Sequence, residues 1–165
     1  ASPRTKLYLN GEKLTKLVVP SDITNLNNGV FYACKSITEA VLHDGVTTIG
    51  ISVFGSCQTL EKITFGNGVE SISSNAFSYC RALKSIVIPD SVRELGNNAF
   101  KECTGCESFV IGSGVTTIGS NVFENCAGEL IINSRIVETD YDNGTTEYRC
   151  GELNTTLTDK INVYF

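Results

Sequence analysis

The seven cysteines are the residues of this chain with the clearest chemical potential. Five of them recur at intervals of 23 residues, namely Cys34, Cys57, Cys80, Cys103 and Cys126. A disulfide needs Cβ atoms about 3.8 Å apart and converging side chains. Equivalent residues on neighbouring parallel strands lie about 4.8 Å apart and point the same way. The spacing therefore favours a column of small buried hydrophobic side chains over a series of disulfides.

The sequence CTGC at residues 103–106 could instead be a redox or zinc motif. Cys103 belongs to the cysteine column, however, and Cys106 stands where Leu60 and Leu83 stand in other repeats, so a core position explains both. A structural zinc site takes four ligands, and the only histidine, His43, lies far away in the sequence. We therefore predict no metal site and no cofactor.

Cys150 belongs to no column, and a buried position, a free thiol and an interchain link all stay open for it. Catalysis finds no support either. His43 falls at a turn position that other repeats fill with Pro or Gly, which favours a surface turn residue. Acidic residues fall at unlike positions of the repeats, which indicates a solvated face rather than a catalytic pair. We predict no catalytic residue and a protein that is not an enzyme.

A 23-residue period organises the chain from residue 22 to residue 133. The blocks are 22–44, 45–67, 68–90, 91–113 and a shortened 114–133, and the sequence GVTTIG occurs at both 45–50 and 114–119. A second column holds Phe31, Phe54, Phe77, Phe100 and Phe123, and a third holds Leu26, Ile49, Ile72, Leu95 and Ile118. Apolar columns at a fixed period of about 20–29 residues are typical of a leucine-rich-repeat solenoid.

Each repeat is expected to contribute one strand and one compact turn. LEKITF (60–65) and LKSIVI (83–88) read as strands, VESI (69–72) continues extended, and SNAFSYC (74–80) is compact enough for one helical turn capped by Ser74 or Asn75. The fold class is thus a β-rich solenoid with a right-handed coil, a parallel strand sheet on a concave face and short helical turns on the other side.

The ends of the chain depart from the period. Residues 1–21 are expected to form a hairpin cap, turning at Asn10-Gly11, together with the first strand. Residues 134–165 form an irregular segment that ends on KINVYF, a repeat-like strand. We expect residues 1–165 to be one domain. Because the chain contains no Met and ends on an apolar strand, we also expect a trimmed product whose natural protein continues beyond Phe165.

The composition argues against nucleic-acid binding and against a membrane-spanning helix. A net charge of −5 is unlike the basic surface that nucleic-acid binding requires. The sequence contains no run of 18 apolar residues that would cross a membrane as a helix.

The outward positions of the predicted strands form two columns. One holds Lys16, Glu39, Lys62, Ser85 and Ser108, and the other holds Val18, Val41, Thr64, Val87 and Val110. An exposed apolar stripe can mark a binding surface, and solenoids bind ligands on such faces. The high strand propensity of valine explains the second column equally simply, so both interpretations stay open.

The sequence LKSIVIPDSVRELGNNAFKECTG (83–105) carries a family resemblance. It resembles the BspA-like, Treponema pallidum-type leucine-rich repeat of gut Bacteroides-like bacteria, over about residues 14–133. The resemblance implies a bacterial cell-surface or secreted protein and, in some members, binding to host matrix proteins or to other bacteria.

These observations favour a non-catalytic, adhesin-type module that binds a protein through the two outward columns, such as an extracellular-matrix or mucosal protein of a host. The alternative is a passive structural spacer within a longer repeat protein. The uncapped C-terminal strand also offers a surface for self-association.

Overall fold

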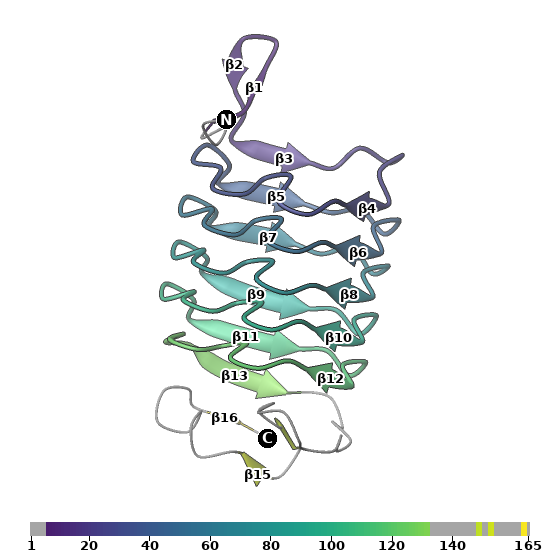
Figure 1. Cartoon of the computed structure of the whole chain (residues 1–165), viewed down its shortest axis with the longest axis vertical. Coiled ribbons are helices and arrows are strands. Elements are labelled where there is room, and N and C mark those ends of the chain that lie inside the picture. Colours follow the sequence, from purple (N-terminus) through teal and green to yellow (C-terminus); the bar gives the residue numbers. More distant parts are fainter. Residues whose placement is uncertain (1–5, 133–147, 150–151, 154–162, 165) are drawn as a thin grey trace.

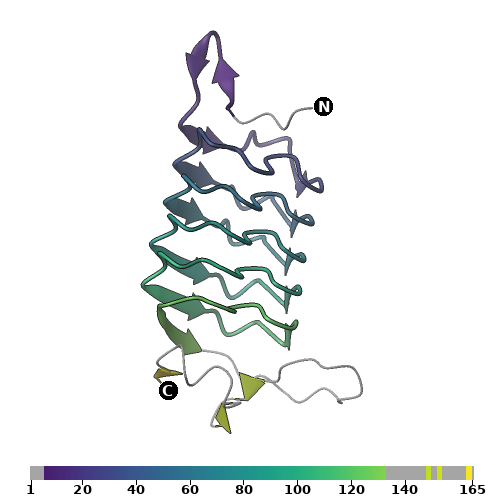
Figure 2. The same cartoon turned by 60° about the vertical axis from the view of Figure 1, so that its left-hand side comes forward.

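A computed structural model describes residues 6–132, 148–149, 152–153 and 163–164. The chain winds into successive coils that stack along one axis (Figures 1 and 2). Each coil contributes a longer strand, a two-residue strand and a segment of turns. Paired strands from successive coils run in parallel, and up to β12 their register is 23 residues, such as Lys16 with Glu39 and Ser85 with Ser108. The predicted solenoid of parallel strands is therefore confirmed.

The longer strands lie on one side of the solenoid, which we call the long-strand face. They are β3 (Lys16–Val18), β5 (Glu39–Val41), β7 (Lys62–Thr64), β9 (Ser85–Ile88), β11 (Ser108–Ile111) and β13 (Glu129–Ile132). Their side chains alternate, because the outward residues are exposed or half-buried while Leu17, Ala40, Ile63, Ile86 and Phe109 are buried.

The two-residue strands form a second sheet, which we call the short-strand sheet. They are β4 (Asn25–Leu26), β6 (Thr48–Ile49), β8 (Ser71–Ile72), β10 (Glu94–Leu95) and β12 (Thr117–Ile118). Each pairs in parallel with the next, so the sheet runs unbroken through all five coils.

The turn side of the solenoid differs from the prediction, because the described residues form no helix there. Asn75 and Tyr79 have positive φ angles of 58° and 61°, which no right-handed helical turn contains. The N–H groups of Asn75, Phe77 and Tyr79 donate to carbonyls of the next coil, at 2.7–2.9 Å, whereas those of the intervening residues donate within their own coil. Stacking between coils thus replaces the predicted helix and its cap.

The interior is a stack of repeated side chains. The phenylalanine rings of neighbouring coils lie parallel, with centroids 5.2–5.9 Å apart and interplanar angles of 3–18°. The five cysteines of the column are also buried. Burial of these columns between neighbours explains why one repeat needs the next, as in other solenoids.

At the N-terminal end, β1 (Tyr8–Leu9) and β2 (Glu12–Lys13) form the predicted hairpin, with positive φ at both Asn10 and Gly11. At the other end, β14 (Tyr148–Arg149) pairs with β15 (Glu152–Leu153), and β16 (Val163–Tyr164) pairs in parallel with β13. Val163–Tyr164, within the C-terminal sequence KINVYF, therefore form a strand that continues the stack. Cys150 lies outside the described residues.

Candidate functional site

The cysteine column is a structural feature rather than a chemical site. The thiols of Cys57, Cys80, Cys103 and Cys126 each donate to the carbonyl oxygen of a phenylalanine 26 residues earlier, at 3.0–3.3 Å. Burial raises the pKa of the Cys57 thiol to about 12 and raises those of Cys80 and Cys103 further above their usual range. Such thiols stay protonated, and the six cysteines of the described coils are free.

Cys106 is equally buried, and its thiol donates to the Ser108 carbonyl at 3.1 Å. Burial also raises its pKa to about 12. Within the described residues, no group of three or more His, Cys, Asp and Glu side chains is placed to hold a metal ion.

His43 connects the turns of the first two coils. Its Nδ1 accepts the N–H of Gly45 at 3.0 Å, so its Nε2 carries the proton and faces the carbonyl oxygens of Pro20 and Ile23, both at 3.0 Å. Both ring nitrogens are thus engaged by backbone groups, which is a structural role.

The two outward columns lie on the long-strand face, and each has one residue on β3, β5, β7, β9 and β11. In the valine column, Val18 and Val87 are 60% and 61% exposed, while Val41 and Val110 are half-buried and Thr64 is exposed. In the other column Lys16, Lys62 and Ser85 are exposed, and Glu39 and Ser108 are half-buried.

The ion pairs of this face lie on its N-terminal strands. Glu39 lies between two lysines, with its oxygens 3.2 Å from Lys16 Nζ and 4.0 Å from Lys62 Nζ. The equivalent positions on β9 and β11 are the neutral Ser85 and Ser108. A partner of this face therefore meets ion-paired side chains on β3, β5 and β7, neutral side chains on β9 and β11, and the exposed Glu129 on β13.

The sheet of the long-strand face is interrupted between β7 and β9. Strands β3, β5 and β7 form one sheet, and β9, β11, β13 and β16 form another. Lys84 N–H still donates to Glu61 O at 3.2 Å, just before the two strands begin. Further along, Val19 and Leu42 donate to the next coil at 3.0 and 2.9 Å, whereas the equivalent N–H of Phe65 donates to no described residue. The strands separate towards their C-terminal ends.

Two residues of the fourth coil explain this separation. An added Cβ at Gly68 or Gly114 would collide with a carbonyl oxygen of the preceding coil. The turns at these two positions therefore pack closely only because glycine has no Cβ. Ser91 stands at the same position and does carry a Cβ, so its backbone cannot approach the third coil as closely, and its Oγ instead donates to Val69 O of that coil at 2.7 Å. Gly112 N–H donates to Ile88 O at 2.9 Å, but Pro89 at the same position has no N–H to donate.

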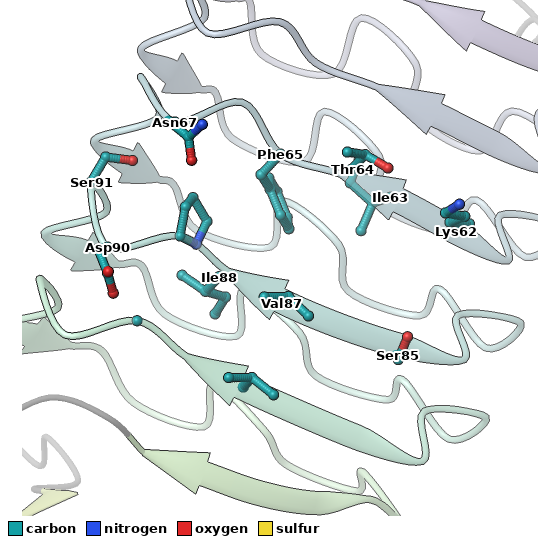
Figure 3. Close-up of a pocket in the computed structure, with 13 residues that line it drawn as sticks. Lys62, Ile63, Thr64, Phe65, Asn67, Ser85, Val87, Ile88, Asp90 and Ser91 are labelled. Carbon is teal, nitrogen blue, oxygen red and sulfur yellow. The ribbon is translucent and has the colours of Figure 1, made fainter.

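The separation produces a groove of about 670 Å³, which we call the β7–β9 groove. Phe65 lies between the two strands, with Thr64 and Val87 on the outward faces beside it (Figure 3). Val110 extends the apolar lining onto β11. Lys62 lies at the end of the groove where β7 begins, and Asp90 lies at the opposite end, just beyond the C-terminal end of β9. Hydrogen bonds from Ser113 lower the pKa of the Asp90 carboxyl, so the groove has a cation and a carboxylate at opposite ends.

Sequence reasoning placed Lys62, Thr64, Ser85, Val87 and Val110 on one surface, and the groove brings all five together. It did not assign the other lining residues to this surface, and among these are Phe65, Asn67, Pro89 and Asp90. A signal was present: only the fourth block has Ser where the three blocks at 45, 68 and 114 begin with Gly.

Known proteins place this solenoid in a family. The BspA-type leucine-rich repeat region matches residues 4–130 in six copies. The chain belongs to the BspA-type leucine-rich-repeat family. This confirms the resemblance in the repeat sequence and extends it over the N-terminal hairpin.

Solved structures agree with this BspA-type fold. A Treponema pallidum leucine-rich repeat protein is 30% identical, with a TM-score of 0.68, over 72% of this chain and 57% of that one. A leucine-rich cell surface protein of Faecalibacterium prausnitzii is 24% identical, with a TM-score of 0.70, over 92% and 35%. The pneumococcal vaccine antigen PcpA is 18% identical, with a TM-score of 0.71, over 99% and 44%. The chain therefore spans about a third to just over half of these proteins.

No protein of curated function matches the sequence. In the part of the chain that the structure describes, no helix is long and apolar enough to cross a membrane.

Proposed function

We propose that this chain is a non-catalytic protein-binding module of a bacterial cell-surface or secreted protein, and that it binds through the long-strand face. The single observation that carries the proposal is the β7–β9 groove, an apolar opening in an otherwise regular face. Solenoids use such faces to bind extended ligands.

The groove offers a protein ligand both kinds of contact that protein recognition uses. Val87 is 61% exposed beside the half-buried Phe65, so an apolar side chain would bury surface on both. The Phe65 N–H, which donates to no described residue, is available to a ligand carbonyl. Lys62 and Asp90 at the two ends favour a ligand with opposite charges spaced along it.

The family supports the surface location, since one relative is described as a cell surface protein and another as a vaccine antigen. We therefore place the ligand among extracellular-matrix or mucosal proteins of a host, in an adhesin-type interaction.

The experiment measures binding of the purified chain to a panel of matrix and mucosal proteins by biolayer interferometry, with Val87→Asp alongside. We expect saturable binding that Val87→Asp weakens at least about tenfold, because the carboxylate would be desolvated in the apolar centre of the interface. Thr117→Asp is the matched control, because Thr117 is an exposed strand residue of the short-strand sheet.

Circular dichroism and urea unfolding must show that both variants keep the fold. Equal loss in both variants would place the site elsewhere. Absence of binding to every protein of the panel would favour a passive spacer within a longer repeat protein.

A further inference from the structure

The N-terminal end of the solenoid is capped over only one part of its surface. Leu7 N–H donates to Ser36 Oγ at 2.9 Å, and Leu14 N–H donates to Leu7 O at 2.8 Å. Leu7 and Leu14 pack, partly buried, against the core. These contacts fix the base of the β1–β2 hairpin above Ser36, and the other residues that the structure describes leave the rest of the first coil uncovered.

The uncovered part is an apolar socket. It is a cavity of about 270 Å³ whose lining includes Val19, Ile23, Leu26, Val30 and Phe31. Val30 is 52% exposed and Ile23 is 39% exposed. Phe31 is the first ring of the phenylalanine stack, and it is half-buried where Phe54 and Phe77 are fully buried. At Ile23, Val30 and Phe31 the socket therefore exposes side chains whose equivalents in the later coils are buried.

The hairpin above this end carries apolar side chains that are equally unburied. Tyr8 and Leu9 are each 62% exposed. The hairpin rises along the solenoid axis, away from the first coil (Figure 2). Because its base is bonded to the first coil, the hairpin does not reach its own socket.

We propose that the socket binds the hairpin of a second copy of this chain, in a head-to-head pair with twofold symmetry. One end of the molecule carries both an exposed apolar projection and an unfilled apolar cavity, which is the self-complementary arrangement that a twofold interface requires. In this pair Tyr8 of each copy enters the partner's socket beside Phe31 and Val30. The two hairpins then share the space between the two ends and cover both.

The opposite end of the solenoid favours this pairing over head-to-tail stacking. There the edge of β13 is already paired with β16. At the N-terminal end, β3 and β4 are the edge strands of their sheets, and each pairs only with the strand of the next coil. Within the described residues, the N-terminal end thus combines two strand edges that lack an outer partner with an apolar cavity.

Sedimentation equilibrium from micromolar to submillimolar concentration tests the proposal on the whole chain. We expect a reversible monomer–dimer equilibrium. Tyr8→Lys and Val30→Asp should each raise the dissociation constant about tenfold or more, since each places a charge in the apolar contact. Both positions are more than half exposed in one copy, so the fold should persist, and circular dichroism checks this.

Mixing the two variants provides the sharper test. The Tyr8→Lys chain keeps a wild-type socket, and the Val30→Asp chain keeps a wild-type hairpin. In the mixed pair one contact is native and the other joins opposite charges, so we expect dimers to return. Val87→Asp is the control that should dimerise like the wild type, because Val87 lies on the long-strand face.

A wild-type chain that stays monomeric over the whole range would overturn the proposal, as would a mixture that stays monomeric. Dimerisation that Val87→Asp abolishes would assign the contact to the long-strand face instead. The outcome is independent of the proposed binding function, which is measured with a different ligand.

Discussion

The two sheets of this solenoid are built from the same coils, yet one is continuous and the other is opened. The short-strand sheet pairs through five successive strands, whereas the long-strand face divides between β7 and β9. The coil period is constant, so it does not explain the difference. The cause lies in single residues of the fourth coil, where Ser91 brings a Cβ and Pro89 lacks an N–H. A repeat protein can thus create a local site by changing two turn residues while its core columns stay intact.

The largest expected effect comes from breaking the core that both sheets share. Phe77 is fully buried between the rings of Phe54 and Phe100, at 5.2 and 5.3 Å, and contacts Phe65 edge-on. Phe77→Ala should lower the free energy of unfolding by about 3–5 kcal/mol. Urea unfolding measures this, and Tyr79→Ala, an exposed aromatic of the same coil, is the control. A loss below about 1 kcal/mol would show that the stack carries little of the stability.

A second opening can be made by copying the serine of the fourth coil. In Gly68→Ser the new Cβ would collide with the Asp44 carbonyl, which forces the second and third coils apart. We expect a loss of about 1–3 kcal/mol in urea unfolding, as for other overpacked sites. Ser91→Gly removes the natural Cβ and one hydrogen bond, from Ser91 Oγ to Val69 O at 2.7 Å, so we expect a smaller loss of about 1 kcal/mol. Equal effects of the two changes would refute the steric explanation of the groove.

The fold is largely readable from the sequence, because the 23-residue columns determine both the register of the strands and the buried face. The hairpin at Asn10-Gly11 follows equally from local turn chemistry. The helical turn at residues 74–80 was wrongly predicted, since Asn75 and Tyr79 adopt positive φ and their N–H groups bond to the next coil. Those bonds exist only in the stack, and no local propensity encodes them.

The candidate site was only half readable. The alternation of side chains along a strand predicts that Val87 and Lys62 point outward. A 23-residue period, however, predicts the same structure for every coil. The groove arises where one coil differs, at Ser91 and Pro89, and its depth depends on how closely backbones approach across coils. That approach is a property of packing, which the alternation of side chains does not contain.

The pH dependence of stability tests whether the cysteine column stays inaccessible to water in the folded chain. The unfolded chain releases the Cys57 proton near the usual value of 9.0, and the folded chain holds it until about pH 12. In this window the unfolded state binds fewer protons, so stability should fall with rising pH, by about 1.4 kcal/mol per pH unit for each such thiol. Urea unfolding between about pH 8 and about pH 10, under reducing conditions, measures the slope.

Cys57→Ala should make that slope of stability against pH less steep, by the contribution of one thiol. A flat profile in the wild type would mean that water reaches the cysteine column in the folded chain.

The smallest expected effect concerns the ion pairs that Glu39 forms on the long-strand face. Glu39→Gln removes the carboxylate that lies 3.2 Å from Lys16 and 4.0 Å from Lys62. The side chains of both lysines are more than half exposed, so the loss should be about 0.2–1 kcal/mol and should shrink in high salt. Urea unfolding at low and high salt tests this. A larger, salt-independent loss would indicate that Glu39 acts through packing.

The most direct test of the opened face is amide hydrogen exchange of Phe65 against Leu42, measured by NMR on the native chain. The two residues occupy the same position of consecutive coils, but only the Leu42 N–H is bonded, to Thr64 O at 2.9 Å. We expect Phe65 to exchange at least about a hundredfold faster than Leu42. Equal protection of the two amides would contradict the account, because it would mean that the strands pair across β7 and β9 and that no groove exists.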